Sequence, residues 1–176
     1  MKKQAHIRAE SNKGFYLSDG GRSLAGYKGY AGDCVARALS HFYFEERDLS
    51  FKHLDNFEER KAFCYKLAYD WISARMEKAG MKRSARNGCP KHVFEPIFKE
   101  LGLVWNSCMF KNAKVRHRIG NLPRKASYII RLAGHIVYGK NNVIYDTWDS
   151  SQKMVYGFWA FKKYETFGDQ NEYEAE

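Results

Sequence analysis

The spacing of apolar residues changes near Gly102, where a helical period gives way to short strands. Before that point, apolar positions recur at intervals of three and four residues, which predicts helices over 34–44, 57–78 and 90–101. Gly80 follows the second of these segments and is its expected C-cap. The first half of the chain is therefore expected to be mainly helical.

After Gly102 the apolar residues are β-branched or aromatic and come in short runs between turns. These runs predict strands at 103–105, 127–132, 134–138, 142–145 and 155–161. Helices followed by strands are typical of an α+β fold, here with N-terminal helices packed on a C-terminal antiparallel sheet. Residues 1–30 show neither period and are expected to form a loop-rich lead-in with little regular structure.

The charge of the chain is uneven. All 30 Lys and Arg residues lie at or before Lys163, whereas five of the 20 acidic residues follow it, so residues 1–163 carry a formal +15. With 176 residues in total, we expect a single domain over 1–163 and an acidic tail over 164–176. A basic body suits nucleic acid or an acidic protein as a partner, although a merely solvated basic surface has the same composition.

Several classes of protein are not favoured by the sequence. No apolar run approaches the length of a membrane span, and the first residues lack an apolar signal-peptide core, so we expect a cytoplasmic protein without membrane contact. The four cysteines form no Cys-x-x-Cys pair and are expected to be free thiols. We expect no cofactor and no metal, because a zinc site would have to combine Cys89, His92, Cys108 and His117, and only its first half has suitable spacing.

Cys34 stands at the expected start of the first helix. Asp33 before it is a good N-cap residue. A thiol in the first turn faces unpaired backbone N–H groups and the positive end of the helix dipole, and both favour the nucleophilic thiolate. Arg37, one turn on, adds positive charge. The alternative is a buried structural cysteine, which is what most free cysteines are.

A cysteine nucleophile needs a base, and His135 is the best placed of the six histidines. It begins an expected strand after Gly134, a glycine that would let another segment approach closely. Asp146 ends the next strand and would orient the base. If residues 140–141 form a two-residue turn, His135 lies directly opposite Asp146, and Asp149 falls beyond the pair.

Together these residues resemble the papain-like fold superfamily, and they look similar to its small members encoded by phages and mobile elements. The resemblance rests on Gly-Asp-Cys-Val-x-Arg-Ala at 32–38, on Gly-His at 134–135 and on Asp-Thr-Trp-Asp at 146–149. It implies a papain-like fold in which Cys34 is the nucleophile, His135 the base and Asp146 the orienting group. By the same resemblance, Trp148 would shield the base as the tryptophan of the papain Asn-Ser-Trp motif does.

The pattern departs from papain in three places. Lys28 stands at the spacing of the papain glutamine that helps to stabilise the oxyanion, so Lys28 or its neighbours in 26–32 are expected to line that site beside the Cys34 N–H group. An Asp as third member is closer to transglutaminases and bacterial acyltransferases. Asp33 beside the thiol would oppose thiolate formation unless its side chain is turned onto the helix N–H groups as a cap.

The expected function is that of a cysteine peptidase or isopeptidase, which cleaves an amide bond of a protein or peptide through a thioester on Cys34. Acyl transfer by the same three residues, with an amine in place of water, fits the sequence as well. The alternative to an enzyme is a non-catalytic basic module that binds nucleic acid or a host protein. It would use the Tyr, Phe and Trp residues interleaved with Lys and Arg over 103–131.

Overall fold

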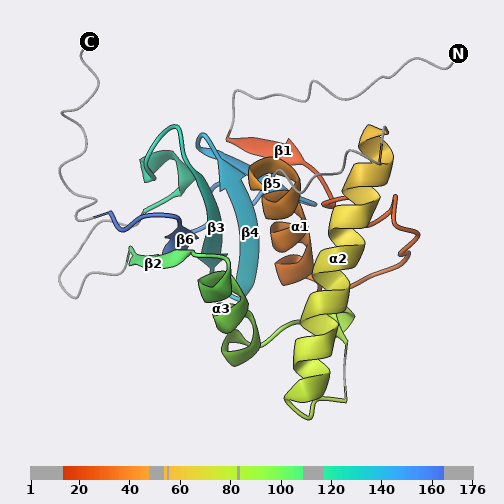
Figure 1. The fold of residues 1–176 in the computed structure, drawn as a ribbon. Coiled ribbons are helices and arrows are strands. Elements are labelled where there is room, and N and C mark those ends of the chain that lie inside the picture. The colour runs from red at the N-terminus through yellow and green to blue at the C-terminus, as the bar shows by residue number, and fades with distance from the viewer. Residues whose placement is uncertain (1–13, 48–53, 55, 83, 109–116, 165–176) are drawn as a thin grey trace, which may run out of the picture.

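The computed structural model of the chain describes residues 14–47, 54, 56–82, 84–108 and 117–164. In this part of the chain, the fold consists of three α-helices and a six-stranded mixed sheet (Figure 1). The helices are α1 (Cys34–Glu46), α2 (Phe57–Lys78) and α3 (Lys91–Glu100). The prediction of an α+β fold is therefore confirmed.

The helices begin and end close to the predicted residues because the sequence carries their stop and start signals. α2 has the predicted bounds: the Asn56 side chain accepts a hydrogen bond from the Glu58 N–H group, and Gly80 follows the helix with φ +73°. α1 starts at Cys34 as predicted and continues to Glu46. Local signals therefore suffice to place the helices along the chain.

The strands lie in the order β1-β5-β4-β3-β6-β2 across the sheet. Their bounds are Phe15–Leu17 (β1), Val104–Ser107 (β2), Ser127–Leu132 (β3), His135–Lys140 (β4), Val143–Asp146 (β5) and Gly157–Ala160 (β6). All the predicted strands form, with 127–132 as predicted and the others shifted by a few residues. The site of interest lies where β4 begins and β5 ends.

The first strand corrects two predictions. Residues 15–17 were expected to be loop, but they form β1, which pairs in parallel with β5 through Leu17 and Asp146 at its end. The sheet is therefore mixed and not wholly antiparallel. β1 is only three residues long, which is too short for a period of two to be recognised in the sequence.

The hairpin between β4 and β5 has a different register from the predicted one. Asn141 and Asn142 form its turn, both with positive φ (50° and 62°), and Lys140 pairs with Val143. Two positive φ angles are what a tight hairpin turn of this kind requires, and asparagine tolerates them better than lysine does. The pairing is thus shifted by two residues from the prediction, which keeps the same side chains on each face of the sheet.

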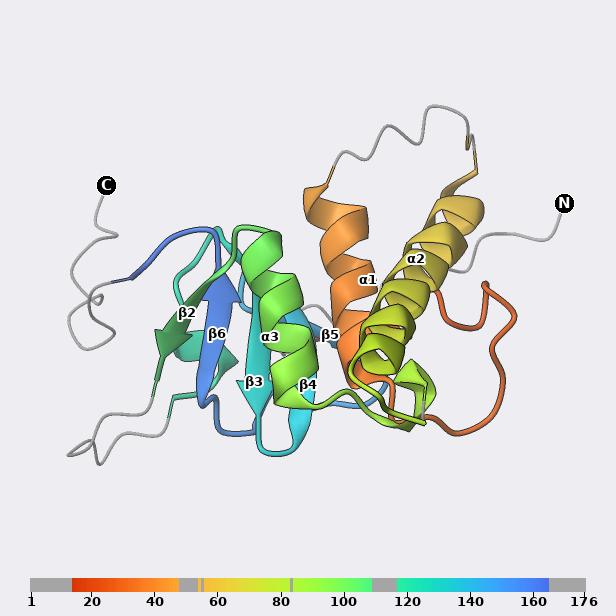
Figure 2. The same cartoon turned by 60° about the horizontal axis from the view of Figure 1, so that its bottom comes forward.

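α1 is sandwiched between α2 and the sheet (Figures 1 and 2). Leu39 and Phe42 of α1 are fully buried in this layer together with Ile72 of α2 and Tyr138 of β4. Burial of such side chains stabilises each by about 1.5–3 kcal/mol relative to exposure. α1 is therefore held in place along its length, which fixes the position of Cys34 at its first turn.

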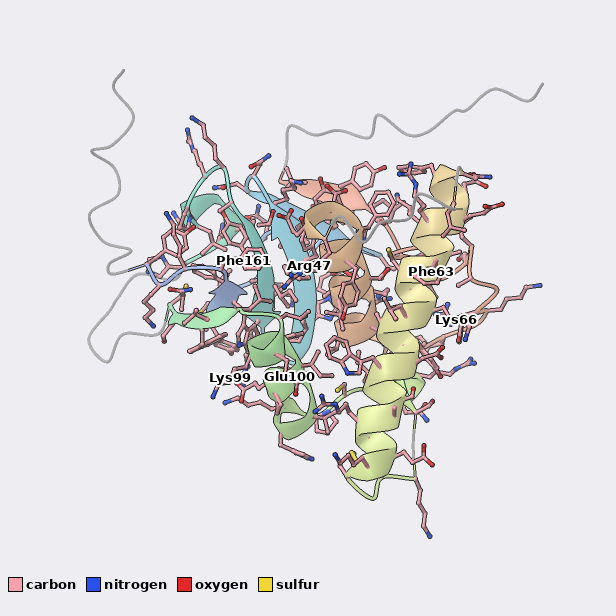
Figure 3. All side chains as sticks on the ribbon, in the orientation of Figure 1. Arg47, Phe63, Lys66, Lys99, Glu100 and Phe161 are labelled. Carbon is pink, nitrogen blue, oxygen red and sulfur yellow. The ribbon has the colours of Figure 1, made fainter. Side chains whose placement is uncertain are left out.

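α3 covers the sheet beside α1 and is tied to both other helices. Its rings at Phe94 and Phe98 pack on Trp159 of β6, with centroid separations of 5.7 and 5.0 Å. Arg47, directly after α1, donates to the Leu101 carbonyl at 2.6 Å and lies over the Phe161 ring (Figure 3). These contacts fix the C-terminal end of α1, at the opposite end of the helix from Cys34.

Two expectations fall partly outside the described residues. The acidic tail predicted over 164–176 is described only at Tyr164, so the domain boundary there stays a prediction. Of the helices that the structure describes, none combines the length and the apolar character that a membrane span requires.

Candidate active site

Cys34 is the first residue of α1 and is partly exposed. The first bond inside the helix runs from the Arg37 N–H group to the Asp33 carbonyl at 3.0 Å. The N–H groups of the three residues before Arg37 therefore have no acceptor within the helix. Asp33 does not cap them, because its side chain makes no cap hydrogen bond. The thiol thus lies beside backbone donors and the positive end of the helix dipole.

His135 begins β4 directly after a tight turn. Leu132 at the end of β3 pairs with His135, so Ala133 and Gly134 form the turn, with Gly134 at φ +63°. A Cβ atom added at Gly134 would meet no other atom within 4 Å. The glycine is needed for its left-handed backbone and not, as the sequence suggested, for close approach of another segment.

The His135 ring is held by Asp146. Its Nε2 atom lies 2.7 Å from Oδ2 of Asp146, which is only 3% exposed. The predicted contact is therefore confirmed, although the register is not the predicted one. Counting on from the Tyr138–Tyr145 pair places Asp146 opposite Val137, so Asp146 reaches His135 as a diagonal neighbour.

Two further groups fix the Asp146 carboxylate. The Thr147 N–H group donates to Oδ1 at 2.8 Å and the Ser150 hydroxyl donates to Oδ2 at 2.9 Å. Burial alone would raise the pKa of Asp146, but the hydrogen bond and charge of His135, aided by these donors, hold it below the usual value. Asp146 is therefore a carboxylate at neutral pH.

The other ring nitrogen of His135 is left for Cys34. Burial alone would raise the pKa of the thiol, but hydrogen bonds from His135 and from the Ile136 N–H group, with the charges of His135 and Arg37, outweigh burial and lower it. Burial alone would lower the pKa of His135, but hydrogen bonds to Asp146 and Cys34 raise it to about 9. These opposed shifts favour a thiolate–imidazolium pair at neutral pH.

Trp148 covers the imidazole. Its ring stacks on His135 with a centroid separation of 5.4 Å and an interplanar angle of 27°, while 44% of the residue stays exposed. Partial cover of this kind excludes water from one side of the His135–Asp146 pair and strengthens their interaction. Asp149 is exposed, and its Oδ1 atom accepts from the Ser151 N–H group, so it takes no part in orienting His135.

Asp33 is buried beside the thiol, and its charge is neutralised by residues from three segments. The Arg22 Nε atom lies 3.0 Å from Oδ2, Arg37 lies 3.5 Å from Oδ1, and the Tyr65 hydroxyl donates to Oδ2. The prediction that this side chain caps α1 is wrong, because these partners turn it into the interior. The negative charge of Asp33, which opposes formation of the Cys34 thiolate, is offset instead by the guanidinium groups of Arg22 and Arg37.

Arg37 connects the two buried carboxylates. Besides Asp33, its guanidinium contacts the Thr147 hydroxyl at 3.3 Å and lies 4.0 Å from Oδ1 of Asp146. Charges therefore alternate along a chain from Arg22 through Asp33, Arg37, Asp146 and His135 to Cys34. Each charge has a neighbour of opposite sign, so neither carboxylate acts on the thiolate unopposed.

An Arg37→Gln variant is expected to raise the pKa of Cys34. The substitution removes the positive charge that faces the thiol and leaves Asp33 and Asp146 less neutralised. Alkylation of Cys34 by iodoacetamide at pH 6 should slow by roughly threefold to tenfold, a pKa change of about 0.5 to 1. The pH profile of alkylation measures this, and Thr147→Val is the matched control, because it removes only the hydrogen bond to Arg37. An unchanged profile would mean that Arg37 is merely structural.

Lys28 has no direct part in this arrangement. It is exposed, and its backbone carbonyl accepts from Arg22 at 3.0 Å and from Arg86 at 3.2 Å. Within the described residues, no hydrogen bond or ion pair joins its side chain to the site. Lys28 as an oxyanion donor therefore stays a prediction that no contact supports, whereas the loop that carries it is held in place by two arginines.

The remaining cysteines and histidines do not compete with this pair. Burial raises the pKa of Cys64 and of Cys108 to about 12. His41 is buried between α1 and the sheet, where burial lowers its pKa to about 3, so it remains neutral. Among the described residues, no three His, Cys, Asp or Glu side chains are grouped as a metal ion would require. Cys89, His92, Cys108 and His117 therefore do not form a zinc site in this structure.

Several residues of the site carry no signal in the sequence. Arg22 and Tyr65 reach Asp33 from a loop and from α2, and the Ile136 backbone reaches the thiol from β4, so only the folded chain brings them together. Ser150 is the exception. It lies four residues after Asp146 within a turn, a spacing at which short polar side chains often bond to one another.

Searches of protein-family models, of curated proteins and of solved structures find no match for this chain.

Proposed function

We propose that the chain is a papain-like cysteine hydrolase that cleaves amide bonds, as a peptidase or isopeptidase. One observation carries the proposal: a helix-start cysteine and a strand-start histidine interact closely enough to lower the pKa of the thiol and raise that of the imidazole, and the imidazole is bonded to a buried carboxylate. Nucleophile, base and orienting group in this order are what acyl transfer through a cysteine requires.

In the first step, the Cys34 thiolate attacks the carbonyl carbon of the amide. A C–S bond forms, and the carbonyl oxygen takes the negative charge. Backbone N–H groups at the start of α1, that of Cys34 among them, are the donors available to this oxyanion. When the C–N bond breaks, the leaving amine takes the proton of the His135 imidazolium, and the thioester remains on Cys34.

In the second step, water replaces the amine. His135, now neutral, accepts a proton from the attacking water, and the C–S bond breaks to release the carboxylic acid and the thiolate. Asp146 holds the ring through Nε2, so the nitrogen that faces Cys34 both gives and takes the proton. An acceptor amine in place of water would make the same steps an acyl transfer.

Selective alkylation tests the nucleophile. At pH 7, iodoacetamide is expected to modify Cys34 at least about tenfold faster than Cys64, Cys89 or Cys108. His135 lowers the pKa of the partly exposed Cys34, whereas burial raises the pKa of Cys64 and of Cys108. Peptide mapping by mass spectrometry measures the four rates. Cys89 is the internal comparison, since it is also partly exposed. Equal rates at Cys34 and Cys89 would contradict the proposal.

Acylation tests the reaction itself. With p-nitrophenyl acetate, we expect a burst of nitrophenolate and an acetyl group on Cys34, both absent from a Cys34→Ser variant. Added hydroxylamine then distinguishes the two outcomes of the thioester, because faster turnover with the amine indicates that acyl transfer competes with hydrolysis. A burst that persists in Cys34→Ser would assign the nucleophile elsewhere.

A further inference from the structure

Cys34 is partly exposed to solvent. A cavity of about 790 Å³ lies elsewhere, between the segments that carry Gly14, Arg118, Asn142 and Gln152, and neither Cys34 nor His135 lines it. Small-molecule substrates are usually enclosed by a pocket that covers most of their surface. A partly exposed thiol outside that cavity is accessible to a segment of a larger molecule, whose chemistry can be inferred from the residues around the thiol.

The surroundings of the thiol, which we call the rim, consist of two segments next to the catalytic residues together with the Arg86 side chain. Lys28 and Tyr30 lie in the loop before Cys34, and Arg86 binds the carbonyls of both at 3.2 Å. Trp148 and Lys153 follow Asp146, with the Lys153 ammonium 5.7 Å from the centre of the Trp148 ring. Contacts of Arg37 with Thr147 connect the start of α1 to the second segment.

The cations of the rim lack carboxylate partners. Within the described residues, no ion pair involves Lys28, Arg86 or Lys153, although other exposed cations do have one, for example Lys66 with Asp70 and Lys91 with Glu95. Residues 1–163 hold 30 cations and only 15 acids, so cations without an ion pair are expected elsewhere on the chain as well. The rim therefore presents uncompensated positive charge to whatever approaches Cys34.

The carboxylates near the thiol are turned away from this surface. Asp33 and Asp146 are 1% and 3% exposed and are each neutralised by arginine or histidine. Asp149 is the exposed carboxylate in the segment that follows Asp146, whereas the rim carries three exposed cations, Lys28, Arg86 and Lys153. The net charge of the exposed rim groups is positive.

Two exposed aromatic rings complete the rim. Tyr30 is 94% exposed although its backbone carbonyl is bound by Arg86, and Trp148 is 44% exposed although it stacks on His135. Both rings are thus presented to solvent from anchored positions. Aromatic and arginine side chains are enriched at the centres of protein–protein contacts, where they provide contact area at a low entropic cost.

We infer that the rim binds an acidic segment of another protein and that this segment carries the bond cleaved at Cys34. The inference rests on the proposed function, because it names the substrate class for that site. Glutamate or aspartate side chains beside the scissile bond would pair with Lys28, Arg86 and Lys153. Apolar parts of the same segment would lie on Tyr30 and Trp148.

Binding of fluorescein-labelled poly-glutamate to the full chain tests the inference without any need for catalysis. The Cys34→Ser variant serves as the receptor, and fluorescence anisotropy measures the affinity. We expect Lys28→Glu with Lys153→Glu in that background to weaken binding by about tenfold or more, because two attractive contacts become repulsive. Binding should also weaken when salt is raised, since exposed charges are screened.

Lys125→Glu with Lys162→Glu is the matched control, with the same change in net charge. Ala126, next to Lys125, bonds to Asn141 just past the far end of β4, roughly 16 Å from His135. Lys162 follows β6, whose pairing with β3 runs toward that same end. If both double variants weaken binding equally, the chain attracts anions through its overall charge and the inference is wrong.

Two further outcomes would overturn the inference: no binding of poly-glutamate, or tighter binding of single-stranded DNA that depends on the same two lysines. Poly-glutamate should also protect Cys34 of the unmodified chain from iodoacetamide, whereas poly-lysine should not. The two proposals can fail separately. Slow alkylation of Cys34 would contradict the proposed hydrolase activity. If Cys34→Ser binds poly-glutamate no more tightly than the same protein with Lys28→Glu and Lys153→Glu, only the proposed substrate class is contradicted.

Discussion

An alanine at position 135 is expected to return Cys34 to an ordinary thiol. The substitution removes the hydrogen bond and the positive charge that lower the pKa of the thiol, while burial, which raises it, remains. A thiol with a pKa of about 8.5 or above is less than about 1% ionised at pH 6. Alkylation of Cys34 at that pH should therefore slow by roughly 30- to 100-fold, allowing for the weaker nucleophilicity of low-pKa thiolates.

The pH profile distinguishes this effect from damage to the fold. In the unmodified chain, His135 with a pKa of about 9 stays protonated at neutral pH, so the thiolate persists well below pH 8. In His135→Ala the rate should rise only as the thiol itself ionises. The difference between the two proteins is therefore largest at low pH and should shrink as the pH rises through the pKa of the thiol in His135→Ala.

His92→Ala is the matched control for that variant, because His92 is exposed on α3 and is not part of the site. Its alkylation profile should overlay that of the unmodified chain. A His135→Ala protein with an unchanged profile would show that the helix start and Arg37 alone lower the pKa of Cys34. The histidine would then not be the base.

The helices could be predicted from the sequence because their information is local. Apolar period, Asn56 at the start of α2 and Gly80 after its end each act within a few residues. The turn between β4 and β5 was also visible as a turn, but its register was not. This tight turn needs two successive residues with positive φ, and Asn141 and Asn142 adopt such angles more readily than Lys140 and Asn141 would. The turn therefore forms at 141–142 and not at 140–141, and this sets the register.

The candidate site could be predicted in part for a different reason. Cys34 was indicated by its place at a helix start. The contact between His135 and Asp146 was predicted correctly although the register was not, because a shift of two residues leaves both side chains on the same face of the sheet. Residues that act across the fold could not be found in this way. Tyr65 and Arg22 meet Asp33 only because α2 and the N-terminal loop pack around the start of α1.

The same limit explains the error about Asp33. A local rule assigns an aspartate before a helix to its cap, since the carboxylate can accept from the first N–H groups. In the fold, two guanidinium groups and a phenol compete for that carboxylate and take it from the cap. The consequence for the chemistry is favourable, because the uncapped N–H groups remain free to face an oxyanion.

Asp146 and Asp149 are close in sequence but are expected to differ widely in effect. Asp146→Ala removes the acceptor of His135, Ser150 and Thr147 from a buried position, and the loss of such a buried partner costs about 3–5 kcal/mol of unfolding free energy. Alkylation of Cys34 at pH 6 should fall by about 10- to 100-fold, because the pKa of His135 loses the contribution that Asp146 makes to its rise. Urea unfolding and the alkylation rate measure the two effects.

Asp149→Ala is the control within the same turn. Its side chain is exposed and bonds only to the Ser151 backbone among the described residues, so stability should change by less than about 0.5 kcal/mol and the alkylation rate by less than about twofold. Asp146→Asn keeps the fold testable if the alanine variant unfolds. The amide retains an oxygen for the Thr147 N–H group but no charge, so its alkylation rate should lie between those of Asp146→Ala and the unmodified chain. If Asp149→Ala slows Cys34 more than either Asp146 variant does, the acid that orients His135 comes from the turn after β5 and not from the strand.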